Sequence, residues 1–72
     1  MTKQELKKIL IEHKEYENFV DAVKKHQADG KIFLRFVIYG KEENFEIGFD
    51  CVENKIIAAK AFSMKTRKSR KL

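Results

Sequence analysis

The sequence predicts an α+β domain in which one long N-terminal helix packs on a three-stranded antiparallel β-meander. Two observations lead to this class. Apolar residues recur at helical spacing over about residues 3–28, and three segments rich in β-branched and aromatic residues follow, separated by short polar loops. A chain of 72 residues has room for one domain and one core.

The sequence contains signals for where this helix begins, which of its faces is apolar and where it ends. Thr2 and Glu5 have the spacing of a capping box, which predicts an N-terminus at residue 3. Apolar or amphipathic residues then recur every three or four positions, at Leu6, Ile9, His13, Tyr16, Val20 and Val23. Gly30 is suited to the left-handed conformation that commonly ends a helix.

Three strands are predicted after the helix. The first covers residues 32–39 and ends at Gly40. The second covers residues 45–51, where apolar residues alternate with polar or small ones, as in a half-buried antiparallel strand. The third covers residues 55–62 after a turn at Asn54, although its alanines are weak strand formers.

The helix is too long for this sheet. A helix of about 26 residues spans about 39 Å, whereas a strand of about eight residues covers about 26 Å. Either the helix breaks near residues 13–16, or its N-terminal turns overhang the sheet and pack on another chain. We favour the overhang, which makes Leu6, Ile9 and Leu10 the expected contact of a homodimer.

The net charge of +5 lies entirely in the last ten residues, since bases and acids are equal in number in residues 1–62. The cations of this segment are Lys65, Arg67, Lys68, Arg70 and Lys71. We therefore expect a domain over residues 1–62 and a flexible basic tail over residues 63–72. Such a tail can neutralise nucleic-acid phosphates, or it can simply aid solubility.

One face of the sheet should remain uncovered, because a single helix covers only the other. Alternation places four residues of the first strand there: Phe33, Arg35, Val37 and Tyr39. Aromatic rings beside an arginine can stack unpaired bases. Glu46 and Asp50 share this face and repel phosphate, so the alternative is a protein contact, with a second copy or with the tail folded back.

No pattern indicates an enzyme, a cofactor or a metal site. His13 and His26 lie out of phase on a straight helix, and the single Cys51 alternates in phase with buried positions. There is no glycine-rich phosphate loop and no cysteine–histidine cluster for zinc. The longest early apolar run, residues 9–11, is too short for a signal peptide or a membrane span. A cytoplasmic protein without membrane contact is expected.

The order of a helix, three strands and a basic segment resembles the double-stranded RNA-binding domain, whose second helix begins with lysines that straddle a groove. The resemblance covers topology only. The segment Lys65-Thr66-Arg67-Lys68 matches that lysine cluster poorly, and residues 63–72 lack the apolar positions of a packed helix. Membership of that family is not inferred.

Two functions of different classes remain. The first is a small non-enzymatic binding protein, an accessory nucleic-acid-binding factor that contacts phosphates through its C-terminal tail. The alternative is a self-associating protein–protein interaction module whose tail is incidental. The concentrated basic tail favours the first function, and the electrically neutral body favours the second.

Overall fold

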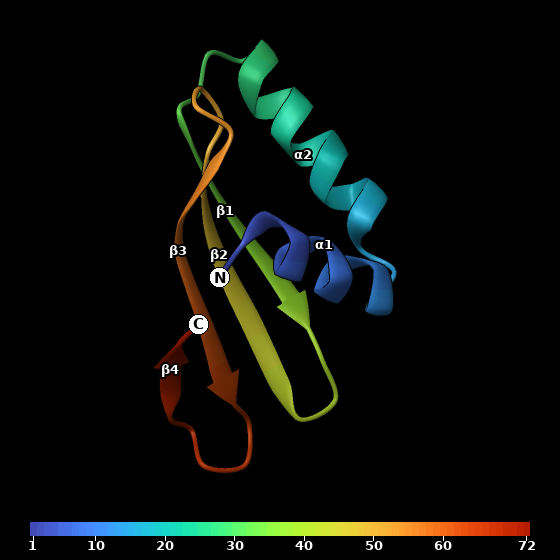
Figure 1. Cartoon of the computed structure of the whole chain (residues 1–72), viewed down its shortest axis with the longest axis vertical. Coiled ribbons are helices and arrows are strands. Elements are labelled where there is room, and N and C mark those ends of the chain that lie inside the picture. Colours follow the sequence, from blue (N-terminus) through green and yellow to red (C-terminus); the bar gives the residue numbers. More distant parts are fainter.

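Two helices cover one face of a four-stranded antiparallel sheet in the computed structural model, which describes residues 1–72 (Figure 1). The helices are α1 (Lys3–Glu12) and α2 (Tyr16–Ala28). The strands are β1 (Phe33–Tyr39), β2 (Glu43–Asp50), β3 (Lys55–Ser63) and β4 (Ser69–Lys71), and they lie side by side in that order. The α+β class is confirmed, whereas the single long helix and the three-stranded sheet are wrong in detail.

The expected long helix is interrupted between α1 and α2. The backbone N–H of Lys14 donates to the carbonyl of Ile11 at 3.1 Å, and that of Glu15 donates to the carbonyl of Leu10 at 2.8 Å. This pair of bonds is a Schellman motif, which ends a helix with a left-handed residue. Lys14 holds that conformation, with φ of 57°. The break falls where the length mismatch allowed one, at residues 13–16.

Helix α2 ends in the same motif, but with the residue that the sequence predicts. The N–H of Gly30 donates to Gln27 at 3.2 Å, and that of Lys31 donates to His26 at 2.8 Å. Gly30 has φ of +72°, which glycine adopts without steric cost. The two helix ends therefore differ mainly in the residue at the left-handed position.

Replacing Lys14 with glycine should stabilise the protein. The left-handed conformation costs a residue with a Cβ atom about 1–2 kcal/mol, so we expect Lys14→Gly to raise the free energy of unfolding by about 1 kcal/mol. Urea denaturation followed by circular dichroism measures this change. The matched variant is Gly30→Ala, which should lose about 1 kcal/mol, since nothing lies within 4 Å of the added Cβ.

A lower free energy of unfolding in Lys14→Gly would contradict the interruption of the helix at Lys14. Glycine in the interior of a continuous helix costs about 1 kcal/mol relative to a good helix former. The sign of the change thus distinguishes two helices from one.

The break lets α1 turn across the sheet instead of overhanging it (Figure 1). Leu6 and Leu10 are 3% and 1% exposed within their own chain, and Ile9 packs partly buried against the same core. The core joins both helices to the sheet through Leu6, Leu10, Phe19, Leu34, Ile38, Ile47, Phe49, Cys51 and Ala59. The overhang that suggested a homodimer contact at Leu6, Ile9 and Leu10 is therefore absent.

The basic segment folds back on β3 as a hairpin and supplies the fourth strand. The N–H of Ser63 donates to the carbonyl of Lys68, and the N–H of Arg67 donates back to Ser63, both at 2.9 Å. Beyond β4, the N–H of Leu72 donates to Ala59 at 2.8 Å, and the Leu72 side chain packs against the core. Residues assigned from sequence to a tail outside the domain thus complete the sheet.

Candidate functional site

The sheet face opposite the helices carries no covering element. Strand register arranges its side chains in rows across the sheet. One row contains Tyr39, Asn44, Phe62 and Ser69, and the next contains Val37, Glu46, Lys60 and Lys71. We call this surface the open face.

The structure gives the four first-strand candidates different surroundings. The Phe33 ring lies over Gly48, with Cε2 and Cζ 3.2 Å from the position that a Cβ would take there. The Arg35 guanidinium donates to the Glu46 carboxylate at 3.0 Å. Val37 is half-buried. Tyr39 is 76% exposed and its hydroxyl makes no hydrogen bond within the chain, so its ring is the most available of the four.

A shallow hollow of about 250 Å³ lies beside Tyr39. Its walls include Tyr39 and Phe62, and its polar lining includes Asn44 and Glu46. Neither Asn44 nor Phe62 was predicted from the sequence as a site residue. The sequence signal for Phe62 was its separation of two residues from Lys60, because residues two apart on a strand share a face. The pairing of β3 with β2 places both residues on the open face.

The basic hairpin lies at the same end of the sheet as this hollow. Phe62 and Ser69 flank its turn and share the Tyr39 row. Figure 1 shows the β1–β2 loop and the β3–β4 loop side by side at the lower end of the sheet. We call residues 64–68 the basic loop; its cations Lys65, Arg67 and Lys68 are all exposed.

The two remaining C-terminal cations, Arg70 and Lys71, lie on opposite faces of the sheet. Arg70 makes a bidentate ion pair with Glu43, with nitrogen–oxygen distances of 3.1 to 3.3 Å, so its charge is already compensated. Lys71 lies directly opposite Lys60 on the open face. The structure therefore brings Tyr39 and four of the five basic candidates to one end of the sheet, whereas Phe33 lies at the other end and Arg70 is paired with Glu43.

The two acids of the open face have partners of their own. The hydrogen bond from Arg35 holds the pKa of Glu46 below its usual value. The pKa of Asp50 is also lowered, because its carboxylate accepts the backbone N–H groups of Glu53 and Val52. Asp50 pairs with Phe33, about 20 Å along β2 from Asn44. Its charge is therefore remote from the hollow.

The lowered pKa of Asp50 predicts a pH dependence of stability. Because the pKa of Asp50 is lower in the folded state than its ordinary value of 3.8, the ionised carboxylate stabilises the folded state at pH values above 3.8. This contribution is lost as the pH falls through the folded-state pKa. We expect Asp50→Asn to show a shallower loss of stability below about pH 4 than the wild type. Urea midpoints measured across the acid range test this. Parallel curves for both proteins would contradict the assignment.

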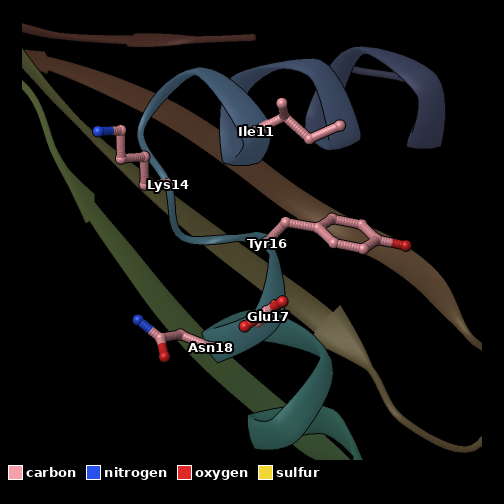
Figure 2. Close-up of a pocket in the computed structure, with 5 residues that line it drawn as sticks. All are labelled: Ile11, Lys14, Tyr16, Glu17 and Asn18. Atoms are coloured by element: carbon pink, nitrogen blue, oxygen red, sulfur yellow. The ribbon is translucent and has the colours of Figure 1, made fainter.

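A second hollow, of about 370 Å³, lies where α1 meets α2 (Figure 2). Figure 2 shows the Tyr16 ring extending away from Lys14 and Asn18, so the side chains diverge. Asn18 donates to Glu15 at 3.0 Å, and the Lys7 ammonium lies 5.5 Å from the centre of the Tyr16 ring. These polar groups interact with each other and do not converge on a common point.

The histidines and the cysteine have structural contacts. His13 and His26 each donate Nδ1–H to the carbonyl four residues earlier, at 2.9 Å. Cys51 is 2% exposed, and burial raises its pKa. No three His, Cys, Asp or Glu side chains are grouped to hold a metal ion, and neither helix has the length and apolar character needed to cross a membrane.

Comparisons with known proteins add no relative. No model of a protein family matches the sequence, and no curated protein and no solved structure matches it either.

Proposed function

We propose that this chain is a small, non-enzymatic binding protein that contacts nucleic acid through the basic loop and Lys71. The observation that carries this proposal is the placement of Lys65, Arg67 and Lys68 on one exposed hairpin loop beside the open aromatic end of the sheet. The proposal includes a cytoplasmic location, where the lone Cys51 stays reduced.

Two physical arguments, one from charge and one from conformational entropy, support this role. Each phosphate that a lysine or arginine neutralises on a duplex contributes about −0.9 to the slope of log K against log salt, so the basic loop with Lys71 gives about −3.6. The loop is also held at both ends by the β3–β4 hydrogen bonds, which lowers the entropy lost when its cations bind. Such contacts supply affinity and orientation but little sequence preference.

The test compares the wild type with a triple variant, Lys65→Gln with Arg67→Gln and Lys68→Gln. Binding to labelled single-stranded and duplex oligonucleotides is measured by fluorescence anisotropy at several salt concentrations. We expect the variant to bind at least tenfold more weakly at low salt, with a duplex slope shallower by about 2.7.

The matched control changes three exposed helix lysines, Lys8, Lys24 and Lys25, to glutamine. It alters the net charge equally but leaves the open face untouched. Equal weakening in the control, or no binding by the wild type at low salt, would overturn the proposal.

Self-association is a second candidate function, supported by two observations. Strand β1 is an edge strand with no partner on its outer side, and Phe33 on the open face is 53% exposed. Sedimentation velocity over a wide concentration range tests it. A dimer that dissociates in Phe33→Ser would support a protein–protein role, and a monomer throughout would remove it.

A further inference from the structure

We propose that the open face takes single-stranded nucleic acid, with an unpaired base held in the hollow between Tyr39 and Phe62; this rests on the nucleic-acid function proposed above. Tyr39 and Phe62 are 76% and 44% exposed and occupy one row of the sheet, on either side of Asn44. Their strands are separated by one strand, so the two side chains start about 10 Å apart.

The size of the hollow limits the ligand. At about 250 Å³ it is smaller than the roughly 300–1,000 Å³ pockets that enclose drug-sized molecules. Its walls are aromatic and its lining is polar at Asn44 and Glu46. A single planar heteroaromatic base fits these conditions.

Unused hydrogen-bonding groups face such a base. Asn44 accepts the N–H of Gly40 through Oδ1 at 3.3 Å, so the donors of its amide nitrogen remain unused. Glu46 accepts from Arg35 through Oε2, and its Oε1 has no partner. The Asn44 amide donors and the Glu46 Oε1 acceptor therefore lie beside the hollow, as the edge of a nucleobase requires.

Charge separates where the base and the backbone bind. The charge of Glu46 at the hollow is compensated by Arg35, which lines the same hollow, whereas the cations of the basic loop are exposed and attract phosphate at the end of the sheet. Lys60 and Lys71 are like charges directly opposite each other, a destabilising pair that a phosphate would relieve. A bound nucleic-acid strand would accordingly place its base over the hollow and its phosphates toward the basic loop, Lys60 and Lys71.

Base stacking in this hollow requires an exposed base face. In a duplex, neighbouring bases cover both faces of every base except at the duplex ends. Only an unpaired base can therefore stack on the Tyr39 ring. The inference therefore predicts a preference for single strands, which phosphate contacts alone do not.

Tyrosine fluorescence tests the inference directly. The chain has no tryptophan and two tyrosines, so Tyr16→Phe leaves Tyr39 as the only emitter. The probes are a thymidine oligonucleotide and a blunt duplex of equal length, with free tyrosinamide correcting for absorption. We expect the single strand to quench Tyr39 emission by about half or more and to bind about tenfold more tightly than the duplex.

Two variants and one control complete the test. Tyr39→Ala and Phe62→Ala should each weaken single-strand binding about tenfold. Phe33→Ala removes the same ring type from the far end of the same face and should change binding less than twofold. Circular dichroism establishes that each variant is folded.

The outcomes separate the two proposals. Binding that depends on the basic loop but not on Tyr39 or Phe62, or that is as tight for the duplex, overturns the stacking inference and leaves the phosphate-binding function. Failure of the wild type to bind either probe at low salt overturns both.

Discussion

Leu10→Ala should lower the free energy of unfolding by about 3–4 kcal/mol. Leu10 is 1% exposed and lies in the core that joins both helices to the sheet. Removing its side chain loses the transfer free energy of the buried methyl groups and leaves a cavity. Because a small domain has a total stability near the low end of about 5–15 kcal/mol, much of the variant should be unfolded in mild urea.

The neighbouring Ile11 provides the control, since it is 55% exposed. Ile11→Ala should cost less than about 1 kcal/mol. Urea denaturation at two protein concentrations adds a test of chain association. If the wild-type midpoint rises with protein concentration and Leu10→Ala removes that rise, Leu10 packs on a second chain and the core described here is incorrect.

The helix break shows what periodicity can and cannot predict. The Thr2 cap and the end at Gly30 were predicted because their residue types have strong local preferences, and both are confirmed. The apolar stripe continues from Ile9 through Tyr16 without a change of spacing, so no pattern marks the break. Lys14 is an ordinary helix residue, and packing of α1 on the sheet offsets the cost of its left-handed conformation.

The fourth strand was missed for a related reason. Residues 69–71 contain no β-branched or aromatic residue, and composition indicated a solvated tail. The strand forms because β3 offers an unpaired edge and Leu72 reaches the core. Lysine and arginine are common on edge strands, where their charge discourages further pairing. The only sequence signal was the apolar residue at position 72.

The candidate site was predictable in composition but not in arrangement. Alternation predicts which residues share the open face, because side chains of a strand alternate between faces. The rows across the sheet depend on loop lengths and on the irregular register at Gly48 and Phe49, which the sequence does not specify. Only the register shows that Tyr39 lies in one row with Phe62, and that the basic loop adjoins them.

Gly40→Ala should cost about 3 kcal/mol, because the added Cβ would overlap a backbone atom. The Cβ position falls well inside van der Waals contact of the Glu43 carbonyl oxygen, and His13 Nε2 lies 3.2 Å from it. The Tyr39–Asn44 pair closes the hairpin across this loop, so the loop cannot open without breaking strand register. Equilibrium urea denaturation measures the loss.

Gly48→Ala is the matched control for Gly40→Ala. Its nearest obstacle is the Phe33 ring at 3.2 Å, a half-exposed side chain that can rotate, so the change should stay within about 1 kcal/mol. Equal losses of stability in Gly40→Ala and Gly48→Ala would show that Gly40 does not lie against the Glu43 carbonyl in the β1–β2 loop. Gly40 also donates to Asn44 beside the hollow. Folded Gly40→Ala protein should therefore bind single strands more weakly than Gly48→Ala, which links the loop geometry to the proposed base site.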